Sequence, residues 1–360
     1  MPLIEKRFLH TFGAAWPRAI GPALTIAPNG DWLCHWISGP QPERDGQPGL
    51  SAVYKRSPDG GQTWGQLRVW IEPDAPDRCG HGHPNYVQDG EIVAFGLTFD
   101  SGPGRMARRR PFRLRSQDSG HTWSPPEPLH DRVGVVTRGG RVVLQDGSWV
   151  FPQHYVRPPD VPWEVLHFRP ELREARDLSA WTWGVNVLRS TDGGRTLLPG
   201  GPVEPSGAVR MNEPHAIQLR DGTLVLLCRA DKDGYLWRTE SGDGGLSWAP
   251  PWRTEIPNPA SKVWLARLTD GRIALVHNPS PTARDPLSLW LSEDEMRTWP
   301  VRVELDSWSA NEAWFTRRPG AGPSTALAYP HAVQAGGTLH VVYDLGRRDV
   351  VHLAIDLARL

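Results

Sequence analysis

The chain has 360 residues, more than a typical single domain, so its length predicts either two domains or one large repeat architecture. Its 40 Lys and Arg residues balance its 40 Asp and Glu residues, which excludes a general attraction to nucleic acid or to an anionic membrane surface. Its 18 Trp, 37 Gly and 36 Pro residues favour short strands and many turns over long helices.

The N-terminal segment and the cysteines indicate the compartment. The segment MPLIEKRFLHTFG has no apolar core long enough for a signal peptide, and no stretch approaches the length of a membrane span. The cysteines, Cys34, Cys79 and Cys228, are odd in number and widely spaced, so neither a disulfide framework nor a thiolate metal site is expected. We therefore expect a soluble, cytoplasmic protein.

Two short turn signals alternate along the chain. The first is a two-residue turn between β-rich runs, and it occurs at Asn29-Gly30, Asp89-Gly90, Asp146-Gly147, Asp221-Gly222, Asp270-Gly271 and Gly336-Gly337. The second is an octapeptide of the form Ser-x-Asp-x-Gly-x-Thr-Trp, and its copies begin at Ser57, Ser116, Ser190, Ser241 and Ser292. Their alternation predicts repeated supersecondary units that pack against one another.

Each repeat is expected to contain two hairpins. In the octapeptide, the Asp can accept backbone hydrogen bonds, Gly permits a positive φ, and the closing Trp can pack into the core. An inner and an outer hairpin make a four-stranded blade, so the repeats predict an all-β, six-bladed β-propeller over residues 1–360, in one domain. The chain has six inner turns but five octapeptides, so the last blade lacks an outer strand. The segment Glu5–Phe12 is expected to supply that strand by pairing the two ends of the chain.

A long connection interrupts the third repeat. The residues 156–184 are too many for a simple turn, and ELREARDL within them is typical of one or two helical turns. We expect this insertion to lie over the functional face of the propeller, as a lid.

The end of the propeller opposite the turns is expected to carry the functional site. It collects the residues that begin each inner strand, which are Arg18, His83, Arg138, Glu213, Lys262 and Tyr329. It also collects the residues that end the following strand, which are Ile37, Leu97, His154, Arg229, Asn278 and Asp344. So many charged residues around a narrow axis predict a polar pocket.

Two features of this face stand out. Glu213 and Arg229 flank a single Asp-Gly hairpin, so a carboxylate and a guanidinium are expected side by side at its open end. The residues 105–115 contain six arginines and follow the second strand of blade two, where they are expected to favour anionic ligands.

The octapeptide resembles the Asp box of the sialidase (neuraminidase) superfamily, also called the BNR repeat, whose members are six-bladed propellers. Four of the five copies keep the Ser, the Asp and the closing Trp; the third ends in Leu197, and the fifth has Glu295 and Met296 at the glycine positions. Because Asp boxes also occur in lyases and in proteins without enzymatic activity, they indicate the fold rather than the chemistry.

The resemblance implies a retaining glycoside hydrolase that releases a terminal acidic sugar, such as sialic acid, and needs no cofactor or metal. Similar residues in the family are a Tyr nucleophile, a Glu that acts as its base, an acid/base Asp and three arginines that bind the substrate carboxylate. The positions that match these roles are Tyr329, Glu213, Asp45 with Glu43 as its alternative, and Arg18, Arg229 and Arg284. Further polar residues of the same face are expected to contact substrate, and these are His83, His154, Lys262 and Asn278.

Two other functions stay open. A polysaccharide lyase on the same fold would use His83 or His154 with a Tyr such as Tyr155 to remove the proton beside a uronate carboxylate, with or without the assistance of a metal. A propeller that binds carbohydrate without turnover is the other alternative. For the hydrolase, the lyase and the binding protein alike, the expected partner is a carbohydrate, and for the hydrolase and the lyase it is an anionic one. The sequence does not indicate the oligomeric state.

Overall fold

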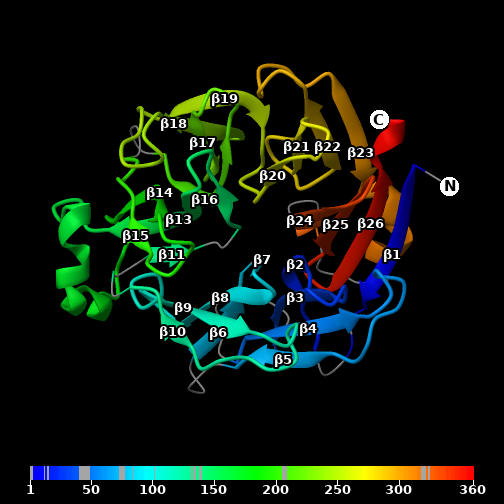
Figure 1. Ribbon diagram of the computed structural model, residues 1–360, viewed down its shortest axis with the longest axis horizontal. Helices are drawn as coiled ribbons and strands as arrows, with labels where there is room; N and C mark the ends of the chain where they lie inside the picture. Colours follow the sequence, from blue (N-terminus) through cyan, green and yellow to red (C-terminus); the bar gives the residue numbers. More distant parts are fainter. Residues whose placement is uncertain are drawn as a thin grey trace.

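The computed structural model describes residues 3–11, 13, 16–39, 49–72, 78–83, 85–100, 102–130, 132, 135–137, 140–204, 209–317, 322 and 325–360. Within these residues, six antiparallel sheets are arranged as a ring around a central axis (Figure 1). The prediction of a six-bladed, all-β propeller is confirmed. The one α-helix in the described part is α1 (Glu312–Thr316), which is only five residues long.

The first three blades follow one another in chain order. Blade one contains β2 (Ile20–Ile26), β3 (Trp32–Ser38), β4 (Ser51–Ser57) and β5 (Arg68–Ile71). Blade two contains β6 (Arg78–Gly82), β7 (Tyr86–Gln88), β8 (Glu91–Asp100), β9 (Arg110–Ser116) and β10 (Glu127–Pro128). Blade three contains β11 (Val135–Thr137), β12 (Val142–Val143), β13 (Trp149–Arg157), β14 (Thr182–Ser190) and β15 (Leu198–Pro199). In blades two and three the inner strand is divided into two pieces that pair with the same neighbouring strand. In blade two, β6 and β7 both pair with β8, and in blade three, β11 and β12 both pair with β13.

The last three blades complete the ring. Blade four contains β16 (Met211–Gln218), β17 (Leu224–Ala230), β18 (Tyr235–Ser241) and β19 (Trp252–Pro257). Blade five contains β20 (Trp264–Arg267), β21 (Ile273–His277), β22 (Leu287–Ser292) and β23 (Val301–Asp306). Blade six contains β24 (Leu327–Ala335), β25 (Thr338–Leu345), β26 (Asp349–Asp356) and β1 (Ile4–His10). Single 3-10 turns occur at η3 (Ser309–Asn311) and η5 (Leu357–Arg359).

The two ends of the chain close the ring. Strand β1 pairs antiparallel with β26, with Ile4 opposite Ile355, and Figure 1 shows the two strands side by side. This pairing removes the unpaired edge that β26 would otherwise present, and it confirms the predicted role of the N-terminal segment.

The octapeptides fasten the outer hairpins as expected. In the first copy, Asp59 Oδ1 accepts a hydrogen bond from the Thr63 amide at 2.8 Å, and Ser57 Oγ accepts one from the Gly61 amide at 2.8 Å. Hydrogen bonds from Thr63, the larger contribution from its hydroxyl and the smaller from its amide, lower the pKa of Asp59 to about 2. The carboxylate therefore stays charged over a wide pH range. The closing Trp64 packs against the core that blade one shares with blade six.

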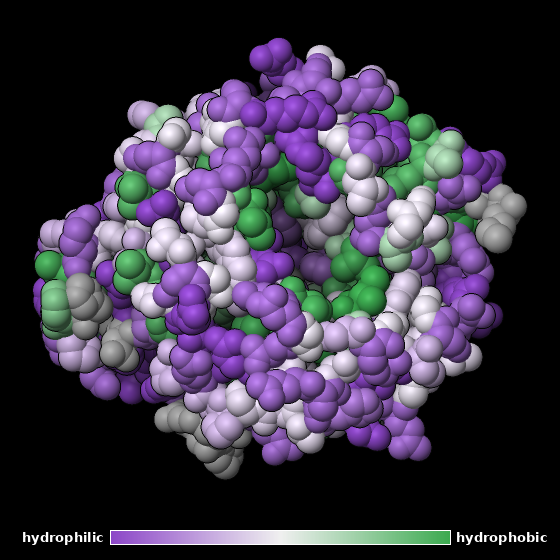
Figure 2. All heavy atoms as spheres, in the orientation of Figure 1, coloured by the Kyte–Doolittle hydropathy of each residue, from purple (hydrophilic) through white to green (hydrophobic). Residues whose placement is uncertain are grey.

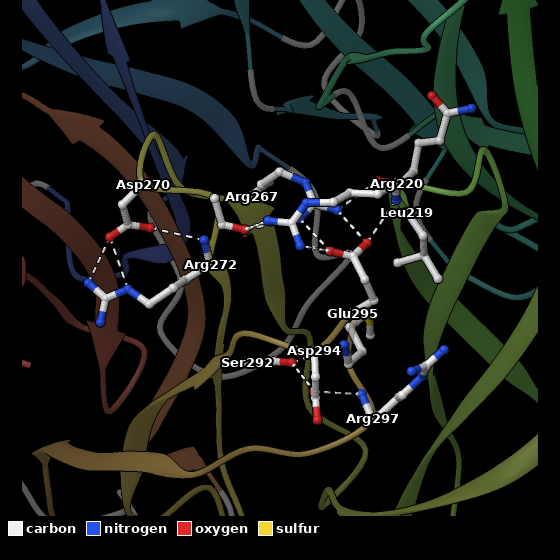
Figure 3. A network of polar contacts seen from close by, with 12 residues as sticks. Leu219, Arg220, Arg267, Asp270, Arg272, Ser292, Asp294, Glu295 and Arg297 are labelled. Atoms are coloured by element: carbon white, nitrogen blue, oxygen red, sulfur yellow. Dashed lines mark hydrogen bonds and ion pairs between the residues drawn. The ribbon is translucent and has the colours of Figure 1, made fainter.

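The fifth octapeptide departs from the pattern and links two blades instead. Glu295 stands at a glycine position and adopts φ 61°, a backbone conformation that costs about 1 kcal/mol for a residue with a Cβ. Its carboxylate binds both terminal nitrogens of Arg267 in blade five at 2.8 Å and accepts the Arg220 amide of blade four at 2.8 Å (Figure 3). Arg220 Nη1 adds an ion pair at 2.9 Å. Glu295 therefore links blade four to blade five through its contacts with Arg220 and Arg267.

Glu295→Gln is expected to lower the free energy of unfolding at pH 7 by about 1 to 2 kcal/mol, because the amide loses charge-assisted bonds to both arginines. The Arg267 hydrogen bonds lower the pKa of Glu295 in the folded protein, so its contribution is present above the ordinary pKa of Glu and is lost as the pH falls. Urea unfolding at pH 7 and in acid measures the effect. Glu293→Gln, at an exposed position of the same octapeptide, is the matched control, and an equal loss in both variants would contradict the bridge.

The insertion in blade three forms two short helices. These are η1 (Trp163–Phe168) and η2 (Pro170–Glu174), and Figure 1 shows them at the outer edge of the ring, beside β14 and β15. Trp163 and Leu166 pack on Tyr155 of β13, and Ala175 O accepts a hydrogen bond from Arg108 Nη1 at 3.4 Å. The insertion is thus anchored to blades two and three, and its function as a lid stays a prediction.

The centre of the ring is open. Figure 2 shows the ring hollowed at its middle, with hydrophilic residues deep inside the opening. On the side of the inner turns, a cavity of about 720 Å³ is lined by the inner strands β2, β7, β12, β16, β20 and β24. No helix in the described part of the chain has the length and hydrophobicity that crossing a membrane requires.

Candidate active site

The inner strands of blades one, four and six share a bulge at the same place, near the end opposite the inner turns. The strand register shifts between Ile20 and Ala23, between Asn212 and His215, and between Ala328 and His331. In each bulge one residue has a positive φ and precedes a proline, and these residues are Gly21 (61°), Glu213 (43°) and Tyr329 (54°). A bulge re-aims a side chain, and a strained non-glycine backbone at equivalent positions indicates a functional constraint.

A pocket of about 70 Å³ lies where these bulges meet. The described residues that line it come from blades one, two, four, five and six. They are Ile20, Gly21, Pro22, Ala23, Ile37, His81, Gly82, His83, Leu97, Arg109, Glu213, Lys262 and Tyr329. Four of the residues expected at the site therefore meet in one pocket, namely Glu213, Tyr329, His83 and Lys262. The predicted polar lining is present, with an apolar wall from blade one.

Glu213 and Arg229 form a buried ion pair at 2.8 Å between Oε2 and Nη1. The hairpin places them together, because Asn212 stands opposite Arg229 in the register of β16 and β17. Burial alone lowers the pKa of Arg229, but Glu213 and then Tyr329 raise it, so the guanidinium stays charged. The Asp-Gly hairpin thus places Glu213 and Arg229 side by side, as the sequence predicts.

Three arginines surround the Tyr329 ring. Arg229 interacts electrostatically with Tyr329, which, after Glu213, raises the arginine pKa. Arg284 Cζ lies 5.2 Å from the ring centroid, and Arg347 Cζ lies 5.9 Å from it. Arg229 and Arg284 also donate to the same carbonyl, that of Ala260, at 3.1 and 3.2 Å. Positive charge is thus concentrated beside the tyrosine, where it favours an anionic group of a ligand and a developing phenolate.

Arg347 was not among the residues predicted for the site. It lies in the turn between β25 and β26, directly after Gly346, with φ 57°. Its position depends on this turn conformation rather than on the repeat spacing used to find the other residues. The signal that would have found it is its place three residues after Asp344, the next-to-last residue of the second strand of blade six.

Asp344 is a buried carboxyl group next to these arginines. It is completely buried, and its Oδ2 accepts a hydrogen bond from the Gly21 amide at 3.1 Å. Burial raises the pKa of Asp344 to about 6, although Arg347, the Gly21 amide and Arg284 act in the opposite direction. Asp344 therefore links the bulge of blade one to the arginines of blades five and six.

We expect Asp344→Asn to be more stable than the wild type at pH 8 by about 2 kcal/mol and equally stable near pH 4. A pKa raised in the folded protein means that the contribution of this group is fully present below its unfolded pKa and is lost as the pH rises through about 6. Thermal unfolding followed by circular dichroism across this range measures the difference. A difference that is constant with pH would contradict the assignment.

The other predicted residues lie around the pocket rather than in its described lining. Arg18 is 1% exposed, and its carbonyl accepts the Ser38 hydroxyl at 2.5 Å. Asn278 is completely buried, and its Nδ2 donates to the carbonyls of Pro286 and Leu327 at 3.0 Å each, so it ties blade five to blade six. His154 is 1% exposed, and its Nε2 lies 3.4 Å from Nη1 of Arg109. Asp45, Glu43 and Arg138 lie outside the described residues.

Tyr155, the tyrosine considered for a lyase, has a structural environment. It is completely buried, its hydroxyl donates to the Val203 carbonyl at 3.3 Å, and burial raises its pKa far above the ordinary value. The residues around it are Trp163 and Leu166 of the insertion, not those of the axial pocket. The prediction that Tyr155 acts at the site is wrong for this reason. Among the described residues, no group of three or more His, Cys, Asp and Glu side chains is arranged to hold a metal ion.

Six antiparallel blades, five of which carry an Asp box in the outer hairpin, define a β-propeller of the sialidase superfamily. The chain belongs to the BNR repeat-like domain family, whose model matches residues 30–341. Within the superfamily it is similar to a sialidase of Micromonospora viridifaciens, with 27% identity over 91% of this chain and 53% of that protein. The chain thus spans about half the length of this relative.

Solved structures show the same fold. A Hadza microbial sialidase, Hz136, superposes with a TM-score of 0.72 at 17% identity, over 95% of this chain and 66% of that one. A Trypanosoma rangeli sialidase in complex with the inhibitor DANA superposes with a TM-score of 0.71 at 13% identity, over 98% of this chain and 60% of that one. At these identities the likeness is one of fold.

Proposed function

We propose that this protein is a retaining glycosidase that releases a terminal acidic sugar, of the sialic acid type, from a glycan. One observation carries the proposal: Tyr329 and Glu213 occupy equivalent bulges, face one pocket, and share a network with Arg229. The similarity to proteins named as sialidases supports the proposal, because a tyrosine, a glutamate and clustered arginines can perform sialidase chemistry.

In the proposed mechanism Arg229 and Arg284 bind the carboxylate of the sugar, as planar guanidinium groups can do with two hydrogen bonds each. Glu213 takes the proton of the Tyr329 hydroxyl while Tyr329 Oη attacks the anomeric carbon. The bond from that carbon to the leaving oxygen breaks, and the leaving oxygen takes a proton from a general acid. Asp45 is the residue proposed for that acid.

Hydrolysis then completes the cycle. The deprotonated Asp45 takes a proton from water, the water oxygen attacks the anomeric carbon, and the bond to Tyr329 Oη breaks. Glu213 returns its proton to the tyrosine oxygen. Two displacements at one carbon retain the anomeric configuration.

Arg347 extends the carboxylate site beyond the residues expected from the sequence. Its guanidinium lies over the same Tyr329 ring as that of Arg284. Arg347 is therefore proposed as a further arginine that binds the sugar carboxylate together with Arg229 and Arg284, the role that was expected of Arg18.

The test is a panel of 4-methylumbelliferyl glycosides of sialic, ketodeoxynonulosonic and uronic acids, together with neutral glucosides and galactosides. Release of fluorophore from a sialic or ketodeoxynonulosonic acid derivative, with the α-anomer as the first product in proton NMR, is the expected outcome. Absence of release from every acidic glycoside would contradict the proposal. Appearance of an unsaturated uronate absorbance on a uronic acid polymer would favour the lyase.

A further inference from the structure

A second large hollow lies away from the axis. Blades four and five are neighbours in the ring (Figure 1), and a groove of about 710 Å³ lies between their outer parts. Strands β18 and β19 form its wall on blade four, and β22, β23 and the fifth octapeptide form its wall on blade five. The volume is typical of a site for a small ligand, and the proposed mechanism does not use it.

The floor of the groove is apolar. Leu227, Trp290 and Trp299 line it and belong to the core that blades four and five share. Met296 of the fifth octapeptide joins them, and it keeps φ 68° although it has a Cβ. The other four octapeptides have glycine at this position. The departure of the fifth octapeptide from the pattern therefore adds a large apolar side chain to the groove.

Trp252 offers an aromatic surface on the wall of blade four. It is 40% exposed, although it is a large apolar side chain. Arg238 Cζ lies 5.8 Å from the centroid of its ring, and Arg238 is itself paired with Glu240 at 2.6 Å. An exposed indole ring within a groove is a platform on which a ring of a ligand can stack.

Arg302 is fixed on the opposite wall. Its Cζ lies 4.1 Å from the centroid of the Trp290 ring, and its Nε donates to the Trp299 carbonyl at 3.1 Å. The side chain is exposed, and among the described residues its terminal nitrogens make no hydrogen bond or ion pair, not even with Glu255 in the lining or Glu304 on the same strand. A guanidinium held in this way can bind a carboxylate through two nitrogens with little loss of side-chain entropy.

One segment leads from the groove to the axial pocket. It begins at Pro257, which lines the groove, and ends at Lys262, which lines the pocket. Between them, the Ala260 carbonyl accepts hydrogen bonds from Arg229 and Arg284. Five peptide steps span at most about 18 Å, so this end of the groove lies close to the residues proposed to bind the sugar carboxylate.

We propose that the groove is a second carbohydrate site, which binds a chain of carboxylate-bearing sugars with one ring stacked on Trp252 and one carboxylate on Arg302. The choice of a glycan rests on the proposed function, in which the axial pocket takes the end of such a chain. The absence of net charge on the protein argues against nucleic acid as the occupant. A polymer held in the groove keeps its ends at a high local concentration near the pocket.

Calorimetric titration of the Tyr329→Phe protein with a hexamer of α2,8-linked sialic acid tests the proposal. The methyl α-glycoside of sialic acid is present at saturation, so that the axial pocket is occupied. We expect Trp252→Ala and Arg302→Gln each to weaken binding of the hexamer about tenfold, because a central Trp or Arg contributes on this scale. Arg302→Lys should recover little of the loss, since it keeps the charge but not the planar fork.

Matched controls come from the outer strand of blade six. Phe8 of β1 is 45% exposed, and Arg7 beside it pairs with Glu5. Phe8→Ala and Arg7→Gln should leave the affinity for the hexamer unchanged. A blocked hexaglutamate peptide, which carries as many carboxylates as the hexamer but no sugar rings, should bind at least tenfold more weakly.

The outcomes separate this inference from the proposed function. Displacement of all the hexamer by the methyl glycoside, or equal affinities in the groove variants and the controls, would overturn the second site. Hydrolysis of 4-methylumbelliferyl glycosides would in that case leave the proposed function standing. Binding of the peptide as tightly as the hexamer would overturn the glycan in favour of an acidic peptide. Hexamer binding that depends on Trp252, without hydrolysis of any acidic glycoside, would support the groove and overturn the proposed function alone.

Discussion

Tyr329→Phe is expected to reduce kcat on the best acidic glycoside by about a thousandfold or more, with a much smaller change in KM. The phenyl ring keeps its place among the arginines, since Arg284 and Arg347 lie over its face, but the oxygen that forms the bond to the sugar is gone. Glu213→Gln is expected to have an effect of similar size, because an amide cannot take the proton of the tyrosine.

A matched control and a trapping experiment make this result specific. Tyr235→Phe removes a hydroxyl from β18, where the ring packs with Arg253 far from the axis, and should leave kcat unchanged. A difluorinated acidic sugar should add the mass of one glycosyl group to the wild type, on the peptide that contains Tyr329, and none to Tyr329→Phe. Activity of Tyr329→Phe within tenfold of the wild type, or a label on another residue, would remove Tyr329 from the role of nucleophile.

The fold could be predicted from the sequence because its signals are local. An Asp-Gly pair fixes the register of a hairpin, and the Asp box fastens a hairpin through hydrogen bonds within eight residues, as between Asp59 and Thr63. Such contacts need no knowledge of the rest of the chain. The placement of Glu213 beside Arg229 follows from the same local rule, since one hairpin holds both.

The rest of the site depends on features that spacing does not encode. Counting back from the turns finds Glu213 and Tyr329, but the bulges that turn them into the pocket show in the sequence only as a proline after each. Arg347 owes its position to a turn with a positive φ. Asn278 was expected to contact substrate because its place in the repeat equals that of Arg229, and in the structure its side-chain amide donates to the carbonyls of Pro286 and Leu327, which the spacing did not predict.

The same strain that aims the residues has a consequence for stability. Glu213 and Tyr329 each hold a positive φ, which costs about 1 kcal/mol or more per residue, and Asp344 keeps a carboxyl group buried at a raised pKa. Three unfavourable features in and beside one pocket are typical of sites in which function, rather than stability, determines the residues.

Arg229→Met is expected to lower the free energy of unfolding by about 3 to 5 kcal/mol at pH 7 and to abolish binding of acidic sugars. The substitution removes the partner of a carboxylate that is 4% exposed, so Glu213 is left as a buried charge without its cation. The double variant Glu213→Gln/Arg229→Met, in which neither charge is present, should recover most of this loss, since a neutral amide is far less costly to bury than a carboxylate.

Urea unfolding of the wild type, the two single variants and the double variant gives the coupling energy between the residues. The ion pair of Arg238 with Glu240, at 2.6 Å on the outer strand β18, is the matched control, and Arg238→Met should cost less than about 1 kcal/mol because that pair is partly solvated. A double variant as unstable as the sum of the single variants would show that Glu213 and Arg229 act independently. Without that coupling, Arg229 would not hold Glu213 in place beside Tyr329, and the proposed base would lose its orientation.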